Sequence, residues 1–261
     1  MAQIKANEAL VKALQTWNID HLYGIPGDSV DAVVDSLRTV RDQFKFYHVR
    51  HEEVASLAAA SYTKMTGKIG VALSIGGPGI VHLLNGMYDA KMDNVPQLII
   101  AGQTNSTLLG TKFFQETNIS KMVDDVAVYH HQIQKGDNVF EITNEAIRTA
   151  YEKKGVSVII CPNDLLTQKI KDTTNRPVDT SRPVLPTPSY RSIKKAAKLI
   201  NKSKKPVMLV GVGAKNASTE LQDFIEAAKI PVIHTLPAKT VLPDSHPYSV
   251  GNLGKIGTKT S

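Results

Sequence analysis

Apolar residues along the first 164 positions recur in two alternating patterns, one with the period of a helix and one typical of buried strands. Helical spacing covers residues 6–17, 30–37, 52–65, 80–90 and 139–151. Short apolar runs typical of buried strands cover residues 21–25, 44–49, 69–75, 97–102, 126–132 and 156–161. Strands that alternate with helices in this way predict an α/β fold, with a parallel sheet covered by helices on both faces.

Two of the predicted helices show which residues should face the core. The stripe of the first helix consists of Ala6, Ala9, Leu10, Ala13, Leu14 and Trp17. In the Ala-rich helix at 52–65, the residues expected to face inwards are Val54, Ala55, Ala58 and Ala59.

The rhythm of helices and strands breaks at residues 165–190, where four prolines stand among Thr, Asp and Arg. A new helix follows, in which Ile193, Ala196, Ala197 and Ile200 stand at helical spacing. A strand at 206–211, a helix at 221–228 and a strand at 231–235 come next. We therefore predict a first domain at 1–164, a linker at 165–190 and the start of a second α/β domain at 191–261, incomplete because few strands can be recognised.

Composition narrows the class of protein. The 42% hydrophobic content is ample for a core. No apolar run approaches the ~18 residues of a membrane span, and the N-terminus lacks the apolar block of a secretory leader. A single cysteine, Cys161, rules out an internal disulfide, and together these features predict a cytoplasmic protein.

The net charge of +7 is unevenly placed, because residues 1–164 carry a net −3 and residues 165–261 a net +10. The lysines of the second region are spread over predicted helix surfaces and have no interleaved aromatic residues, so we expect no nucleic-acid partner. The excess is either a solvated basic face or a surface that meets an acidic segment outside this chain.

Four motifs fall at predicted strand ends, where parallel sheets bind ligands. Gly24-Ile25-Pro26-Gly27-Asp28 and Gly76-Gly77-Pro78-Gly79 are strand-to-helix turns whose glycines allow close backbone approach, although either could be a plain turn. Arg50-His51-Glu52-Glu53 begins a helix, so its carboxylates could simply complement the helix dipole. Alternatively one carboxylate faces the crevice, where burial would raise its pKa and let it share a proton. Phe113-Phe114-Gln115-Glu116 lies in a long polar loop.

Taken together, these motifs resemble the pyrimidine-binding domain of enzymes that use thiamine diphosphate (thiamine pyrophosphate), in the pyruvate oxidase and acetolactate synthase group. Further likeness comes from His82-Leu83-Leu84-Asn85-Gly86-Met87-Tyr88-Asp89-Ala90 and Val95-Pro96. The run Phe114-Gln115-Glu116 is similar to the pyruvate oxidase branch, in particular to bacterial oxidases of the quinone-linked type. The resemblance extends over the whole chain.

The resemblance implies roles for individual residues. Glu52 matches the glutamate that hydrogen-bonds the aminopyrimidine ring and favours its imino tautomer, which activates the cofactor. Residues matching the lining of the pyrimidine pocket are Gly24, Pro26, Gly27, Gly77, Pro78, Gly79, His82 and Asn85. Phe114 and Gln115 match residues near the substrate pyruvate and the flavin. In the second domain, the residues that resemble a site for FAD are Gly211, Gly213, Ala214 and Lys215.

The sequence also departs from this family's pattern. The family holds Mg²⁺ and the diphosphate through a Gly-Asp-Gly motif with a downstream Asn, and this chain contains no Gly-Asp-Gly. We therefore expect no metal ligands here, and expect this chain alone to be inactive, as the N-terminal part of a longer protein or a truncated product. The resemblance implies a second identical subunit that completes the site, quinone or oxygen as electron acceptor, and a location in the cytoplasm or at the inner face of the membrane.

Two other functions remain open. An acetolactate synthase, which joins two 2-keto acids, would share most of these motifs. A non-catalytic pyrimidine-domain protein that acts by dimerisation would fold well but bind no flavin. A dinucleotide-binding dehydrogenase is disfavoured, because the turn at Gly24 is not a Gly-x-Gly-x-x-Gly.

Overall fold

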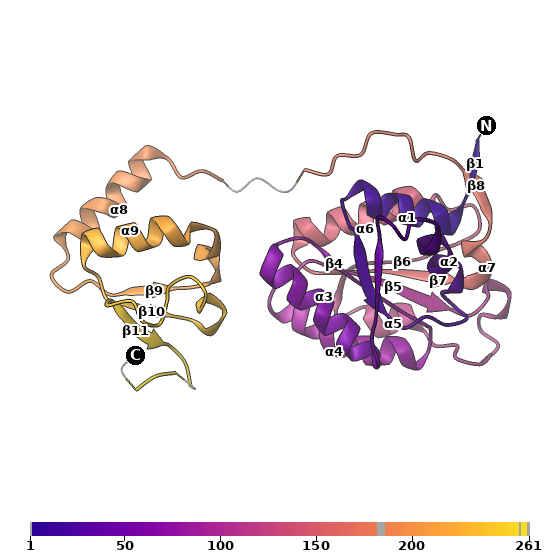
Figure 1. Cartoon of the computed structure of the whole chain (residues 1–261), viewed down its shortest axis with the longest axis horizontal. Coiled ribbons are helices and arrows are strands. Elements are labelled where there is room, and N and C mark those ends of the chain that lie inside the picture. Colours follow the sequence, from indigo (N-terminus) through magenta and orange to yellow (C-terminus); the bar gives the residue numbers. More distant parts are fainter. Residues whose placement is uncertain (1, 182–185, 256, 260–261) are drawn as a thin grey trace. The chain divides into compact units, whose positions relative to one another are not determined.

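The computed structural model describes residues 2–181, 186–255 and 257–259. The chain divides into two compact units, residues 1–184 and residues 185–261 (Figure 1). Each unit has its own sheet and its own core.

The first unit is built on a six-stranded sheet in which every neighbouring pair is parallel. In spatial order its strands are β3 (Lys45–His48), β2 (His21–Gly24), β4 (Gly70–Ser74), β5 (Gln97–Gln103), β7 (Val156–Pro162) and β6 (Ala127–Gln132). Alternate residues of a central strand enter opposite cores, as Val71 and Leu73 do on one face and Ala72 does on the other. The sheet confirms the α/β fold class that the alternation of helices and strands predicts.

Helices cover both faces of this sheet (Figure 1). One face is covered by α1 (Ala6–Thr16), α2 (Asp31–Thr39), α6 (Val139–Lys153) and α7 (Asn163–Leu166). The other face is covered by α3 (Glu52–Thr66), α4 (Pro78–Met92) and α5 (Ile119–Val123). A short 3₁₀ helix, η1 (Ser106–Leu108), follows β5.

Helices α3 and α4 pack closely because small residues meet at their contact. At Gly86 of α4, an added Cβ would lie 2.5 Å from Leu57 N and 2.6 Å from Ser56 C. One predicted inward residue of α3 is wrong: Val54 is 50% exposed, and the buried face is Ala55, Ser56, Ala59, Ala60 and Thr63. Neighbouring α4 sets the rotation of α3, which periodicity alone does not supply.

Residues after β7 form a strand that the sequence pattern does not predict. Strand β8 (Lys169–Lys171) pairs antiparallel with β1 (Gln3–Lys5), and Ile170 is buried there. The first part of the segment expected as a linker, residues 165–190, is therefore ordered structure of the first unit.

The second unit contains a three-stranded parallel sheet in the order β11 (Ser249–Asn252), β10 (Val232–His234), β9 (Met208–Val210). Its remaining elements are α8 (Tyr190–Lys202), η2 (Val212–Ala217), α9 (Ser218–Ala228) and η3 (Leu236–Ala238). Its core consists of Val210, Ile225, Val232, Ala238, Val241 and Leu242. Strand β11 is a third strand in a stretch that looks irregular in sequence.

Helix α8 carries the apolar stripe that the sequence predicts, but none of its residues is buried within the described chain. Ile193 is 51% exposed, and Ile200, the least exposed of the apolar stripe's large side chains, is 36% exposed. Periodicity identifies an apolar face correctly but does not say which element of the described chain covers it. Among the described helices, none is long and apolar enough to cross a membrane.

Candidate functional site

The candidate site lies at the carboxyl edge of the six-stranded sheet. The turns after β2 and β4 are adjacent there, because these two strands are neighbours. Gly76 N donates a hydrogen bond of 3.0 Å to Ser29 Oγ, which ties the two turns together. Ligands of open parallel sheets bind at this edge.

Glu52 is the first residue of α3, and its side chain is largely buried, with 12% exposed. Its Oε2 lies 2.9 Å from Nδ1 of His82, a residue of the second turn of α4. Burial alone would raise the pKa of Glu52. The hydrogen bond with His82, a backbone hydrogen bond and the nearby His82 and His51 imidazoles outweigh burial, and the pKa lies below its usual value.

This direction corrects the expectation that burial raises the pKa of the carboxylate in the crevice. The carboxylate of Glu52 is ionised at neutral pH, so it can accept a proton or a hydrogen bond from a ligand rather than donate one.

Glu53 has a different environment, although it is the next residue along the chain. Its Oε1 accepts a short hydrogen bond from Asn85 Nδ2, and its Oε2 lies 3.7 Å from His51 Nδ1. Asn85, which was predicted to line the pyrimidine pocket, is thus bound to Glu53. Each carboxylate has one partner from α4.

The glycines of the two turns act first through packing. A Cβ at Gly24 would lie 2.5 Å from Leu73 O, and one at Gly27 would lie 2.6 Å from Ile75 Cγ2. Gly79 leaves space beside the Glu52 carboxylate, because a Cβ there would collide with Ser74 Oγ and lie 3.5 Å from Glu52 Oε1. Pro26 and Pro78 are exposed at the same edge.

The loop that carries Phe114 and Gln115 lies against this edge. Gly77 has a φ of +64°, and a Cβ there would meet the Gln115 backbone oxygen at 2.9 Å. Phe114 is 76% exposed. A cavity of about 220 Å³ is lined by the turn residues Asp28, Ser29 and Gly76 and by loop residues that include Phe113, Phe114 and Gln115.

Glu116 fixes the shape of that loop, a role that sequence reasoning missed. Its carboxylate accepts hydrogen bonds from Gly110 N at 2.5 Å and from Phe113 N at 3.2 Å. These backbone hydrogen bonds, that of Gly110 first, lower the pKa of Glu116. The sequence contains one indication of this role, which is an acidic residue shortly after a glycine, Gly110, in the same loop.

Residues 4–122 match the family described as "Thiamine pyrophosphate enzyme, N-terminal TPP binding domain", and residues 193–261 match "Thiamine pyrophosphate enzyme, central domain". The chain belongs to the thiamine pyrophosphate enzyme family. The first match contains β2 to α4 and the loop of Glu116, so it includes every element of the candidate site.

The relatives of this chain carry different names. The chain is 48% identical to YdaP of Bacillus subtilis (strain 168), over 99% of this chain and 45% of that protein. That relative bears the name "Putative thiamine pyrophosphate-containing protein YdaP". The chain is 38% identical to the pyruvate oxidase of Lactiplantibacillus plantarum, over 98% of this chain and 43% of that protein. It is 34% identical to the acetolactate synthase of Mycobacterium leprae, over 98% of this chain and 41% of that protein. The chain thus spans less than half the length of these three relatives.

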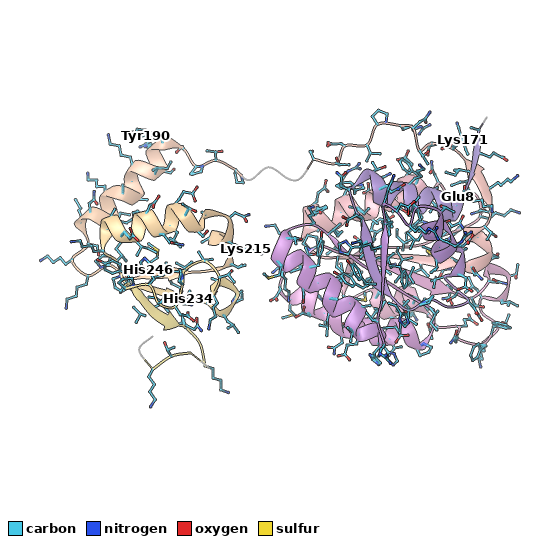
Figure 2. The ribbon with its side chains drawn as sticks, viewed as in Figure 1. Glu8, Lys171, Tyr190, Lys215, His234 and His246 are labelled. Atoms are coloured by element: carbon cyan, nitrogen blue, oxygen red, sulfur yellow. The ribbon has the colours of Figure 1, made fainter. Side chains whose placement is uncertain are left out.

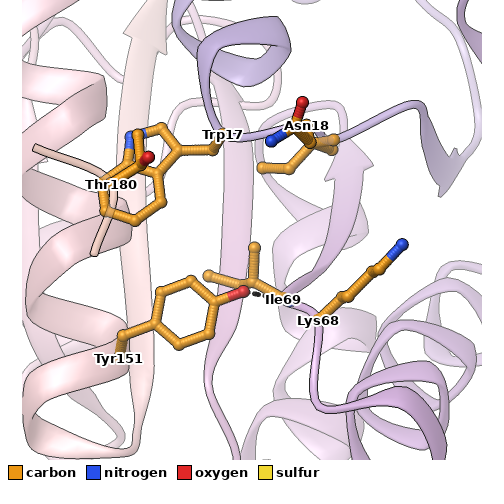
Figure 3. A pocket seen from close by; sticks show the side chains of 7 residues that line it. Trp17, Asn18, Lys68, Ile69, Tyr151 and Thr180 are labelled. Carbon is orange, nitrogen blue, oxygen red and sulfur yellow. Dashed lines mark hydrogen bonds between the residues drawn. The ribbon is translucent and has the colours of Figure 1, made fainter. Parts of the chain in front are cut away.

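A larger cavity, of about 300 Å³, lies at the opposite, amino edge of the six-stranded sheet (Figure 3). Trp17 and Tyr151 stack in its wall with ring centroids 5.9 Å apart, and Tyr151 Oη accepts a hydrogen bond from Ile69 N. Volume therefore does not identify the site. The smaller cavity is the one that meets the strand ends and the sequence motifs.

The residues predicted to bind FAD follow strand β9 in the second unit. A Cβ on Gly211 or Gly213 would meet nothing within 4 Å, so the backbone is open to a ligand. Ala214 N donates to Gly211 O at 3.1 Å, which begins η2, and Lys215 lies on the same 3₁₀ helix (Figure 2). His234, at the end of neighbouring β10, is buried. Among the described residues neither of its ring nitrogens has a hydrogen-bond partner, and its Nε2 lies 3.6 Å from Asp244 Oδ1.

A possible metal-binding group in the first unit was not expected from sequence. Within the described residues, His51, Glu52 and His82 are the one group of three or more ligating side chains whose ligand atoms come together, all within 4.8 Å of one another. Two imidazoles do not suit Mg²⁺, which prefers oxygen ligands. The group therefore does not supply the Mg²⁺ and diphosphate site that the family uses.

Proposed function

We propose that this chain supplies the pyrimidine-binding side of a pyruvate oxidase that depends on thiamine diphosphate and FAD. The proposed reaction is the oxidative decarboxylation of pyruvate to acetate or acetyl phosphate and CO₂. The observation that carries the proposal is the ionised, largely buried carboxylate of Glu52 at the carboxyl edge, with the Cβ-free Gly79 beside it.

Glu52 would hold the proton at N1′ of the cofactor's aminopyrimidine ring. An ionised carboxylate accepts that hydrogen bond, and its partial burial strengthens the interaction. His82 fixes the carboxylate from the other side. The turns at Gly24–Gly27 and Gly77–Gly79 would line the ring. Bound thiamine diphosphate would supply the carbon nucleophile that attacks the keto group of pyruvate.

The loop at Phe113–Glu116 favours an oxidase over a carboligase. Phe114 and Gln115 line the cavity at this edge, and Glu116 holds the backbone just before them at Gly110 and Phe113, so both side chains would be available to substrate and flavin. The higher identity to a pyruvate oxidase, 38% against 34% for an acetolactate synthase, points the same way. Acetolactate synthesis remains the alternative, and product analysis separates the two, because only an oxidase forms acetate with an electron acceptor.

FAD is proposed for the second unit, where Gly211 and Gly213 leave the backbone open after β9. Ala214 and Lys215 would then meet the nucleotide. Purified protein should be yellow and release FAD on denaturation. Mg²⁺ and the diphosphate would be held by residues outside this chain, since no Gly-Asp-Gly is present.

A second identical subunit is proposed as the partner that completes the site. Apolar side chains stand exposed on the outer surfaces of α3 and α4, among them Val54, Val81 and Tyr88. A non-catalytic protein that acts through such a dimer would lack flavin and turnover, which the same preparation tests. Quinone or oxygen is the proposed acceptor, and the cytoplasm or the inner membrane surface the proposed location.

The decisive experiment compares Glu52→Gln with Glu53→Gln in the protein expressed from its own gene. Proton NMR follows deuterium exchange at C2 of added thiamine diphosphate with Mg²⁺. Glu52→Gln should slow exchange by about 10²–10⁴-fold, the range for loss of a positioned proton-transfer group. Glu53→Gln should stay close to wild type, because Glu53 binds Asn85. Equal exchange rates in the two variants would refute the assignment.

A further inference from the structure

Three side chains at the candidate site form an arrangement that the thiamine chemistry does not require. His51 precedes α3, Glu52 begins it, and His82 lies on α4. Their ligand atoms lie within 4.8 Å of one another, and the rings of His51 and His82 stack with centroids 4.3 Å apart. The group brings together two imidazoles and one carboxylate.

We propose that His51, Glu52 and His82 bind one divalent transition-metal ion, such as Zn²⁺, when thiamine diphosphate is absent. Two His and one Glu are a donor set that Zn²⁺ uses when its fourth position stays open. Imidazole also suits Cu²⁺ and Ni²⁺, whereas Mg²⁺ and Ca²⁺ prefer oxygen ligands. The site is therefore selective for the zinc class.

Binding needs a small adjustment at Glu52 and His82 and a rotation of the His51 side chain. Zinc bonds of about 2.0–2.1 Å in a tetrahedron separate neighbouring ligand atoms by roughly 3.3–3.4 Å. The Glu52 Oε2 to His82 Nδ1 distance of 2.9 Å has to open by a few tenths of an ångström. His51 must turn out of its stack on His82, and with 48% of its side chain exposed it has room to do so.

Neighbouring groups help to place His51 and balance the charge. Glu53 Oε2 lies 3.7 Å from His51 Nδ1, and Asn85 holds Glu53 from α4. A carboxylate behind a ligating imidazole fixes its orientation and raises its basicity. The N-terminal end of α3 is unfavourable for a cation, and the charges of Glu52 and Glu53 offset it.

An ion bound to Glu52 Oε2 would engage the same carboxylate that the proposed function assigns to the aminopyrimidine. Zinc and thiamine diphosphate should then exclude each other, so that zinc inhibits loading of the cofactor. This consequence, unlike the metal site itself, rests on the proposed function.

The metal site is tested with the metal alone. Metal-free protein expressed from its own gene is titrated with Zn²⁺ by calorimetry, and with Co²⁺ by visible absorption. One ion should bind per chain, and His51→Ala and Glu52→Gln should each weaken binding at least tenfold. His48→Ala is the matched control, because His48 is exposed at the end of β3 and outside the group.

Two results would overturn the metal site. One is the absence of saturable binding. The other is binding that survives His51→Ala but is lost in His131→Ala, which would place the ion beside Asp137 instead. Circular dichroism confirms that each variant is folded.

A second titration, with thiamine diphosphate present, tests the exclusion. Apparent zinc affinity should fall in proportion to the cofactor concentration. If zinc binds and depends on His51 but the cofactor has no effect, the metal site stands and the placement of the pyrimidine ring on Glu52 fails.

Discussion

The contact between α3 and α4 offers a direct test of how packing sets the site, through the substitution Gly86→Ala. The new Cβ would lie 2.5 Å from Leu57 N and 2.6 Å from Ser56 C, whereas ordinary contact begins near 3.4 Å. Helix α4 must therefore move away from α3 by about 1 Å, because backbone atoms cannot turn aside as a side chain can.

The expected cost follows from two opposing terms. Overpacking of a core contact costs about 1–3 kcal/mol, and the upper end applies because the collision is with backbone. Replacing Gly by Ala within a helix returns about 1 kcal/mol. The net loss is about 2 kcal/mol of unfolding free energy, equivalent to roughly 4–8 °C in melting temperature for a unit of this size.

Calorimetry and urea unfolding measure this loss, with Ser61→Ala on the exposed face of α3 as the control. The control should remain within about 0.5 kcal/mol of wild type. The imidazole ¹⁵N–¹H signal of His82 reports in parallel whether the His82–Glu52 hydrogen bond survives the shift of α4. A Gly86→Ala protein that is more stable than wild type would refute the argument, because propensity alone would then decide the outcome.

Three further predictions concern the first unit. Burial raises the pKa of the Cys161 thiol to about 12, against about 8.5 in an unfolded chain. Above pH 8.5 the thiol therefore ionises only in the unfolded chain, and the free energy of unfolding should fall by about 1.4 kcal/mol per pH unit; below pH 8.5 this group should have no effect. Unfolding at pH 8–11 should show this slope in wild type relative to Cys161→Ala, and a thiol reagent should react only after unfolding. Asp164→Ala removes the carboxylate that accepts hydrogen bonds from Ser106 N (2.7 Å) and Ser106 Oγ (2.6 Å). The free energy of unfolding, measured in urea, should fall by about 1–3 kcal/mol. Asp124→Ala is the control and should cause no such loss, because Asp124 is exposed. Lys64→Met removes partly exposed ion pairs with Asp89 and Asp93. The free energy of unfolding should fall by at most about 1 kcal/mol per pair, and by less at 1 M salt. A larger loss that does not depend on salt would contradict this view.

The main sheet was predictable because its signals are local. Runs such as 97–102 and 156–161 are mostly apolar, and the structure buries every residue of β5 and β7. What failed depends on distant partners. Ile170 is buried because β8 pairs with β1, more than 160 residues earlier in the chain, and no pattern near residue 170 contains that information. The apolar stripe of α8 is visible in sequence, but its exposure is a property of its surroundings.

The position of the candidate site could be predicted from the turns at the strand ends. The charge state of Glu52 could not, because it depends on a contact with His82, 30 residues further along the chain. Burial considered by itself predicts a raised pKa for Glu52, and the hydrogen bond from His82 reverses that sign. The same neighbour, His82, belongs with Glu52 and His51 to the group for which we propose a zinc-class ion. A proton-accepting oxygen with imidazole neighbours can receive either an aminopyrimidine N–H or a zinc-class ion. The occupant is then set by the relative concentrations and affinities of cofactor and metal, which is why the two titrations separate the claims.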